Sequence, residues 1–180
     1  MEFEQTAIEG LVIIRPRIFK DGRGYFFESW NKKTFSDAGI TADFVQDNQS
    51  LSQKGVLRGL HFQSPPFAQA KLVRVISGAV LDVAVDLRKN SATYGKHVSI
   101  ELSAENQTMF FVPEGFAHGF VTLQDDTIFA YKCAGYYNKA SENTLLWNDA
   151  TLGIDWETEH PLLSPKDEEG MAFSSFSSPF

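Results

Sequence analysis

The sequence predicts a mainly β protein, an antiparallel sandwich or barrel of the jelly-roll kind with one or two short helices. Two observations support this class. Short segments with alternating or β-branched apolar residues recur along the chain, and clusters of Gly, Pro, Asn and Asp separate them at short intervals. Hardly any helical pattern lies between these segments, which is typical of antiparallel β folds.

The strand pattern is clearest in segments spread over the first three quarters of the chain. In order, these are Leu11–Phe19, Gly55–Gln63, Lys71–Gly78, Val80–Leu87, His97–Ser103, Thr108–Pro113, Gly119–Leu123 and Thr127–Cys133. Only Asn31–Ile40 has a helical pattern, and Gly39 suits its C-terminal end. The final segment, Ala172–Phe180, is rich in Ser and Phe and is either disordered or docked on a neighbouring surface.

Length and charge limit the classes of function. A chain of 180 residues can bury one sizeable core, so we expect a single domain over residues 1–180. The net charge of -7 argues against nucleic acid or an anionic membrane surface as the partner. No apolar run approaches the roughly 20 residues of a membrane helix. The single cysteine, Cys133, forms no internal disulfide and the N-terminus lacks a secretory signal pattern, so we expect a soluble, cytoplasmic protein.

The segment VLDVAVDL alternates cleanly between an apolar and an acidic face. Asp82 and Asp86 share one face with Val80 and Ala84, and the opposite face is wholly apolar. The acidic face either meets solvent or lines a barrel lumen that holds a ligand. Exposure to solvent is the more common case unless other strands contribute polar groups, and several strands do.

Two histidines lie in turn-rich β segments. In GVLRGLHFQ, Gly59 and His61 share a face if the strand is regular, and a bulge at Gly59 would bring Arg58 round to them. His118 follows a Pro-x-Gly turn in VPEGFAHGF. A lone histidine is more often structural than catalytic, but two beside such turns favour a functional site.

The pattern Pro-x-Gly-x-x-His resembles the second motif of the cupin superfamily, a small jelly-roll barrel that often holds a metal. The first cupin motif normally supplies His-x-His, but here Gln63 stands where the second histidine would be. A transition metal needs three or more imidazole or carboxylate ligands, and no carboxylate is spaced beside His61 and His118. We therefore expect a barrel without a metal or other cofactor.

Proton transfer is the natural chemistry for a histidine in such a barrel. An imidazole can remove a proton from an acidified carbon, and it works better when a carboxylate orients its other nitrogen. Asp167, beside Lys166 in LLSPKDEEG, is a candidate for that carboxylate. Tyr131 is a candidate for the acid that returns the proton, although a tyrosine in a strand is by default a packing residue.

Six separated blocks follow one another along the chain in a specific order. They are DGRGYFFESW, FVQDNQSLSQKGVLRGLHFQ, QAKLVRVISGAVLDVAVDLRKNSATYGK, VPEGFAHGF, YKCAGYYNKASENTLLWNDATLGIDW and SPKD. Together they resemble the dTDP-4-dehydrorhamnose 3,5-epimerase family, metal-free cupins of dTDP-L-rhamnose synthesis. The resemblance implies an isomerase that inverts carbons 3 and 5 of dTDP-4-keto-6-deoxy-D-glucose. It also implies a homodimer in which the N-terminal strand region is exchanged.

The resemblance further implies roles for individual residues. His61 would be the general base with Asp167 as its partner, Tyr131 the acid on the opposite face, and Lys71 the group that stabilises an enolate at the keto oxygen. The positions that match nucleotide-sugar contacts are Arg23, Glu28, Gln46, Asn48, Arg58, His118, Glu142 and Lys166. Guanidinium groups fit phosphate oxygens, so the two arginines are the expected diphosphate partners, and strand exchange would bring Arg23 into the neighbour's site.

Three alternatives stay open at this point. Phe67, Ala70 and Lys139 depart from the family pattern, so an epimerase of a single carbon in another dTDP-deoxysugar pathway is the first. A metal-dependent cupin oxygenase is the second, and it needs a third ligand. The third is a catalytically silent sugar-binding cupin, which would be expected to have lost His61 or Tyr131.

Overall fold

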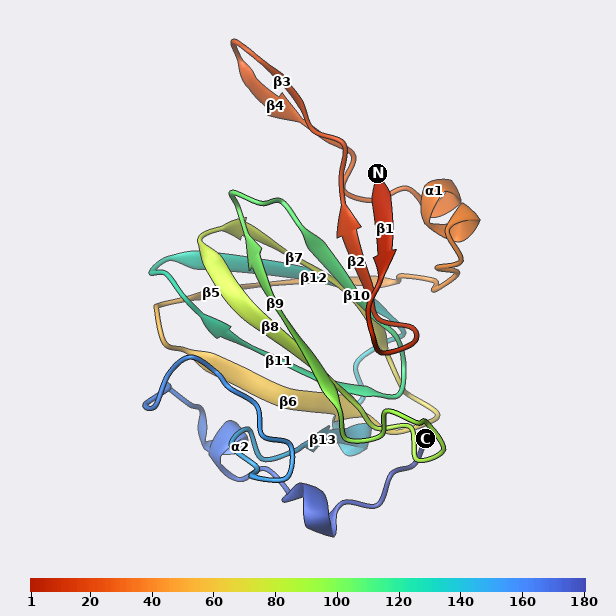
Figure 1. Ribbon diagram of the computed structural model, residues 1–180, viewed down its shortest axis with the longest axis vertical. Helices are drawn as coiled ribbons and strands as arrows, with labels where there is room; N and C mark the ends of the chain where they lie inside the picture. Colours follow the sequence, from red (N-terminus) through yellow and green to blue (C-terminus); the bar gives the residue numbers. More distant parts are fainter.

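Two antiparallel sheets face each other and enclose a barrel in the computed structural model, which describes all of residues 1–180 (Figure 1). The six-stranded sheet has the order β1 (Glu2–Gln5), β2 (Val12–Arg15), β10 (Met109–Val112), β7 (Ala70–Ser77), β12 (Thr127–Ala134) and β5 (Gln46–Ser52). The five-stranded sheet has the order β13 (Glu142–Thr144), β6 (Leu57–Gln63), β11 (Phe116–Thr122), β8 (Ala79–Asp86) and β9 (His97–Ser103). The predicted mainly β, jelly-roll class is confirmed.

Outside these two sheets, few residues form regular secondary structure. They form a separate hairpin, two short α-helices and two 3₁₀ turns: β3 (Phe19–Asp21) with β4 (Gly24–Phe26), α1 (Lys32–Asp37), α2 (Pro165–Glu168), η1 (Lys139–Ser141) and η2 (Phe173–Ser175). The side chain of Asn31 caps α1 by accepting hydrogen bonds from the first turn, and Gly39 follows the helix with a φ of 88°. No helix is long and apolar enough to cross a membrane.

The predicted strands form, with differences at their ends. Leu11–Phe19 forms strand β2 over Val12–Arg15 and is interrupted at Pro16, which has no N–H to donate to a ladder; its last residue, Phe19, begins β3. The predicted strand Gly119–Leu123 begins earlier, at Phe116, which places His118 within β11. The polar strand β5 was not predicted, since its inward side chains are amides and hydroxyls rather than apolar groups.

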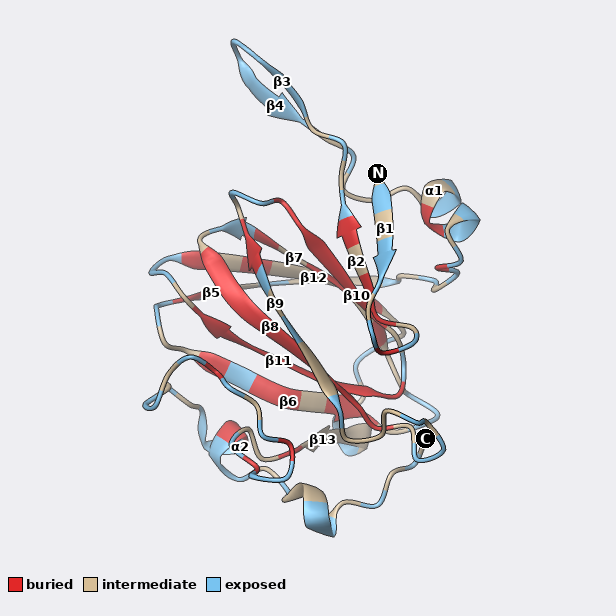
Figure 2. Ribbon diagram, in the orientation of Figure 1, coloured by how far each residue is buried: buried red, intermediate tan, exposed pale blue.

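Strand β8 is buried along its whole length, so the solvent-facing alternative for its acidic face is wrong. Val80 and Ala84 pack between the two sheets, and Leu81 and its apolar neighbours pack under the C-terminal part of the chain. Figure 2 shows the same burial along β11 of the same sheet and β10 of the other sheet. Asp82 and Asp86 are both fully buried and must therefore have hydrogen-bonding partners.

Asp86 fastens the loop that follows β8. Its carboxylate accepts hydrogen bonds from Arg88 Nε (2.9 Å), Ser91 Oγ (2.6 Å) and Thr93 Oγ1 (2.7 Å). Burial opposes ionisation of this group, but the hydrogen bonds from Arg88, Ser91 and Thr93 outweigh burial and lower its pKa to about 2.

The C-terminal segment packs on the outer face of the five-stranded sheet. Phe176 and Phe180 meet Phe62 edge-on, with ring centroids 5.4 and 6.1 Å away. Lys89 N–H donates to the Phe180 carbonyl at 3.3 Å, and the Ser178 hydroxyl donates to the Leu87 carbonyl. The Ser/Phe segment is therefore docked on a neighbouring surface, which is the second of its two predicted alternatives.

The β3–β4 hairpin projects away from the barrel (Figures 1 and 2). Its aromatic side chains are largely uncovered, with exposed fractions of 52% for Phe19, 59% for Tyr25 and 70% for Phe26. A projecting hairpin with three exposed aromatic residues is an apolar surface of the kind that marks an interaction site.

We predict that Asp86→Asn lowers the free energy of unfolding by about 2–3 kcal/mol at pH 7. The reason is that the pKa of an aspartate is about 3.9 in the unfolded chain, whereas the pKa of Asp86 in the folded protein lies well below that value. A carboxylate whose pKa is lower in the folded state stabilises the folded protein above pH ~4, and this contribution is lost as the pH falls towards 2. Urea denaturation at pH 7 and pH 3 should therefore give a smaller difference between variant and wild type in acid.

The control for this prediction is Glu105→Gln, which neutralises an exposed carboxylate and should leave the unfolding free energy unchanged at both pH values. Equal losses for Asp86→Asn at pH 7 and pH 3 would contradict the linkage.

Candidate active site

A cavity lies between the inner faces of the two sheets. It consists of two adjoining hollows of about 350 and 290 Å³, and both are lined by His61, Lys71, His118 and Tyr131. The larger hollow also contacts Gln46, Asn48 and Glu142, and the smaller one Arg58, Lys166 and Asp167. The fold therefore brings together every predicted site residue except Arg23 and Glu28.

A short polar contact in the cavity joins His61 to Asp167. His61 Nε2 lies 2.6 Å from Asp167 Oδ1, and the carboxylate is almost fully buried whereas the imidazole keeps 27% of its side chain exposed. Burial opposes ionisation of Asp167, but hydrogen bonds from His61, Ser164 and the Gly59 N–H lower its pKa to about 2. An ionised Asp167 makes Nε2 the protonated nitrogen of a neutral His61, so Nδ1 carries the free lone pair.

The local sequence explains why Asp167 is available for this contact. Ser164 is the N-cap of the four-residue helix α2, and Pro165 occupies its first turn. The Ser164 hydroxyl donates to Asp167 Oδ2 at 2.6 Å, which leaves Oδ1 for His61 and for the Gly59 N–H at 3.1 Å. The cap motif thus holds the carboxylate in the orientation that His61 requires.

Gly59 is where β6 departs from regular geometry. The register of β6 with β11 shifts between His118 and Phe120, opposite Gly59, whose φ is 142°. A Cβ at this position would lie 2.5 Å from the Gly119 Cα, so only glycine fits. The irregularity brings Arg58 to the same cavity as His61, as a bulge at Gly59 would.

Tyr131 enters the cavity from the other sheet. It lies on β12, in register with Val73 of β7 and Asn48 of β5, whereas His61 lies on β6 of the five-stranded sheet. Burial raises the pKa of the Tyr131 phenol, which keeps it protonated near neutral pH. An imidazole with a free lone pair and a protonated phenol therefore line the cavity from opposing sheets.

Lys71 is a cation without a carboxylate partner. It lies on β7 and lines both hollows, and no acidic oxygen comes within 4 Å of its Nζ. Burial lowers the pKa of its ammonium group. Such an ammonium is available to an electron-rich oxygen of a ligand.

His118 has a carboxylate partner that the sequence did not reveal. Its Nε2 lies 2.9 Å from Asp82 Oδ1 and 3.0 Å from Oδ2, and both side chains are buried. The sequence analysis anticipated Asp167 as the partner of His61 but not Asp82 as the partner of His118. His118 lies on β11 and Asp82 on the adjacent strand β8. In the ladder between these strands Asp82 is in register with Phe120, two residues from His118.

Glu142 and Lys166 form an ion pair between β13 and α2. Glu142 also accepts a hydrogen bond from the Tyr137 hydroxyl at 3.1 Å. Glu142 and Tyr137 line the larger hollow and Lys166 the smaller one, so this cluster lies between the two parts of the cavity.

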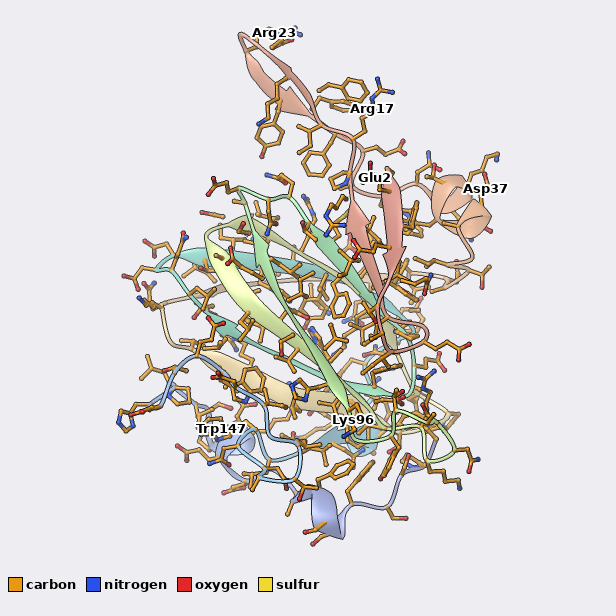
Figure 3. All side chains as sticks on the ribbon, in the orientation of Figure 1. Glu2, Arg17, Arg23, Asp37, Lys96 and Trp147 are labelled. Atoms are coloured by element: carbon orange, nitrogen blue, oxygen red, sulfur yellow. The ribbon has the colours of Figure 1, made fainter.

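Arg23 and Glu28 lie outside the cavity of their own chain. Arg23 is at the tip of the projecting hairpin, as Figure 3 shows, with 90% of its side chain exposed and an ion pair to Asp21 at 2.6 Å. The exposed Glu28 accepts a hydrogen bond from Asn31 at 3.0 Å. Their distance from the cavity follows from the hairpin, which carries this part of the chain away from the barrel (Figure 1).

No group of three or more His, Cys, Asp or Glu side chains is placed to hold a metal ion. The donor set of the cavity contains two histidines, and each has an aspartate as its hydrogen-bond partner. These residues do not fit the ligand set of a metal-dependent cupin.

Gly170, just after α2, packs closely against Leu145, which pairs with the strand that carries His61. A Cβ at Gly170 would lie 2.6 Å from the Leu145 carbonyl carbon and 2.6 Å from the Leu146 nitrogen. Leu145 exchanges backbone hydrogen bonds with Leu60, the residue before His61. The close approach of Gly170 thus sets the distance between the Asp167 helix and β6.

Comparison with known proteins gives one consistent result. The family model described as dTDP-4-dehydrorhamnose 3,5-epimerase matches residues 5–175. The chain is 51% identical over 174 residues to the dTDP-4-dehydrorhamnose 3,5-epimerase of Shigella flexneri, covering 96% of each chain.

Solved structures agree with this match. The dTDP-4-dehydrorhamnose 3,5-epimerase of Elizabethkingia anophelis is 50% identical, with a TM-score of 0.93 over 97% of each chain. The dTDP-6-deoxy-D-glucose-3,5-epimerase of Legionella pneumophila, in complex with dTDP-4-keto-L-rhamnose, is 48% identical, with a TM-score of 0.94 over 98% of this chain and 94% of the other.

We predict that Gly170→Ala weakens the contact between His61 and Asp167, because the new methyl group pushes α2 away from the Leu145 backbone. Asp167 partly offsets the effect of burial on His61, so a more distant carboxylate should let burial lower the pKa of the imidazole further. NMR titration of the His61 ring should show this lower pKa together with a mixture of tautomers.

Gly153→Ala is the matched control. Its backbone has a φ of 59°, so the substitution strains the chain, but the new Cβ meets only the Ala150 carbonyl oxygen, at 3.9 Å. An unchanged His61 titration in Gly170→Ala, or an equal change in Gly153→Ala, would contradict the assigned role of Gly170.

Proposed function

The chain belongs to the dTDP-4-dehydrorhamnose 3,5-epimerase family, and from this premise we propose how its cavity inverts carbons 3 and 5 of dTDP-4-keto-6-deoxy-D-glucose to give dTDP-4-keto-L-rhamnose. The observation that carries the mechanism is the placement of a His61–Asp167 pair and of Tyr131 on opposing sheets around one cavity. A ligand between the sheets would meet a base on one face and an acid on the other.

His61 acts as the base. The keto group at carbon 4 acidifies the hydrogens on carbons 3 and 5, and the free Nδ1 lone pair of His61 takes one of them. The electron pair of the broken C–H bond passes to the keto oxygen and forms an enolate. Asp167, held ionised in its buried position, stabilises the imidazolium that results.

Lys71 stabilises the enolate. Its ammonium group has no carboxylate partner and lies on β7, next to the strand that carries Tyr131. A fixed positive charge near a developing oxyanion lowers the barrier to proton removal, and such electrostatic stabilisation is often the largest catalytic contribution. His118, held by Asp82, is a further hydrogen-bonding group on the cavity wall.

Tyr131 completes each inversion. Its phenol, whose pKa burial raises, donates a proton to the carbon from the face opposite His61, and the enolate electrons return to form the new C–H bond. Solvent then reprotonates the phenolate and deprotonates the imidazolium before the second carbon reacts. The same two groups serve both carbons because one keto group acidifies both.

The remaining polar residues bind the nucleotide diphosphate. Arg58 hydrogen-bonds only to the neutral Ser52, through Nε at 3.3 Å and Nη2 at 3.2 Å, so its charge is free to meet a phosphate. Gln46, Asn48 and Glu142 line the larger hollow, which would take the nucleoside. A thymidine diphospho sugar as ligand is supported by the dTDP-4-keto-L-rhamnose in the Legionella pneumophila structure.

The protein works as a homodimer in this proposal. Arg23 lies far from the cavity of its own chain, on a hairpin with exposed aromatic residues, which supports its delivery to the cavity of a second copy. The outer face of the six-stranded sheet has a further hollow of about 400 Å³ lined by Arg74, Ile76 and Lys132, and this face would pack against the partner.

Proton NMR of the substrate in deuterated water tests the reaction. The wild-type protein should introduce deuterium at both carbons, and trapping with a reductase should confirm the L-sugar. His61→Ala should slow exchange by about 10²- to 10⁴-fold because the base is lost. Tyr131→Phe should retain deuterium exchange better than inversion, since His61 still removes the proton.

His160→Ala removes an exposed histidine outside the cavity and should behave as wild type. Exchange at one carbon alone would assign the protein to the single-carbon epimerases. Binding of the nucleotide sugar without any exchange would instead indicate a binding protein.

Co-expression of Arg23→Ala and His61→Ala chains tests the shared site. A mixed dimer contains one cavity with both residues intact, so random pairing should restore about a quarter of wild-type activity from two impaired parents. Recovery no greater than the sum of the two parents would refute a contribution of Arg23 across the dimer.

A further inference from the structure

Ser50 Oγ is the one buried side-chain polar atom in this protein without a hydrogen-bond partner. The neighbouring inward residues of β5 all have partners. Asn48 accepts from Gln46 at 3.0 Å and donates to Cys133 Sγ at 3.6 Å, and Ser52 accepts from Arg58. The hydroxyl of Ser50 is thus an exception within its own strand as well as in the whole chain.

Ser50 lies between Tyr131, the proposed acid, and Arg58, which is proposed to bind the phosphate. On β5 it is in register with Phe129 of β12, two residues from the pairing of Asn48 with Tyr131. On the other side, the contact between Ser52 and Arg58 joins β5 to β6. Ser50 lines the smaller hollow, which also contains His61 and Lys71.

The neighbours of Ser50 in this hollow do not satisfy its O–H. Phe120 and Phe129 stack with centroids 4.1 Å apart and offer no strong acceptor. Arg58 has donors only, and its Nε and Nη2 are directed at Ser52. The protein thus supplies no partner for the Ser50 hydroxyl, and the smaller hollow, which Ser50 lines, is the place where a bound molecule would supply an acceptor.

We propose that Ser50 is a substrate-binding residue that donates a hydrogen bond to an oxygen of the bound nucleotide sugar. This inference rests on the proposed function, because it takes the nucleotide sugar as the ligand of the cavity. A buried hydroxyl without a partner destabilises the free protein, whereas an apolar replacement removes that cost. The ligand-free protein thus carries a small loss of stability that binding relieves.

The test is Ser50→Ala, for which stability and activity should change independently. We expect kcat/KM to fall about tenfold, the usual effect of one lost hydrogen bond. The Tm should stay the same or rise, because the substitution removes an unpaired polar group. A fall in Tm that accompanies the loss of activity would indicate a structural role and overturn the proposal.

Ser103→Ala is the matched control with the opposite expectation. Ser103 is also buried, but its Oγ accepts the Asn106 N–H at 3.1 Å and it lies at the end of β9, outside the residues that line the cavity. Its loss should lower the Tm and leave kcat/KM unchanged.

Calorimetric titration with dTDP and with the dTDP-linked sugar identifies the part of the ligand that accepts the hydrogen bond. Weaker binding of both by Ser50→Ala assigns the contact to the dTDP part, and weaker binding of the sugar nucleotide alone assigns it to the hexose. Affinities and kcat/KM within twofold of wild type would refute the contact. These affinities do not depend on turnover, so a wild-type protein that binds both ligands without proton exchange would refute the proposed function and not the role of Ser50.

Discussion

The hydrogen bond between His61 Nε2 and Asp167 Oδ1 joins two residues that are 106 positions apart, and the geometry of the cavity depends on it. The buried carboxylate needs donors on every side, and it finds them in β6 and in its own helix cap. Helix α2 therefore cannot lift away from β6 without breaking the hydrogen bonds of Asp167 to Gly59 and His61. In this way the position of His61 is coupled to the packing of the C-terminal segment.

The distribution of charge in the cavity differs from that of the whole protein. The chain carries a net charge of -7, yet the acidic groups in and next to the cavity are all paired, Asp82 with His118, Asp167 with His61, and Glu142 with Lys166. Lys71 and Arg58 have no such partner. An acidic protein thus presents unneutralised cations where a diphosphate and an enolate would bind, which is a local property that net charge does not describe.

Periodicity along the chain predicted most of the barrel, because its central strands are built from β-branched and aromatic residues in short runs between turns. The same reasoning missed β5, whose inward side chains are polar because they line the cavity rather than the core. It also missed Asp82 as the partner of His118. That pairing depends on the register of β8 with β11, and register between strands is not encoded in the spacing of residues along one strand.

The sequence by itself determined the class of fold, the family and the set of side chains from which the cavity is built. Only the tertiary structure decided which of them meet. Arg58 reaches the cavity because β6 is irregular at Gly59, whereas Arg23, which the sequence equally suggested, lies on a hairpin directed away from it. Both outcomes follow from long-range backbone packing. Contacts between distant segments determine the position of a side chain in the fold, whereas local residue patterns determine only what kind of side chain it is.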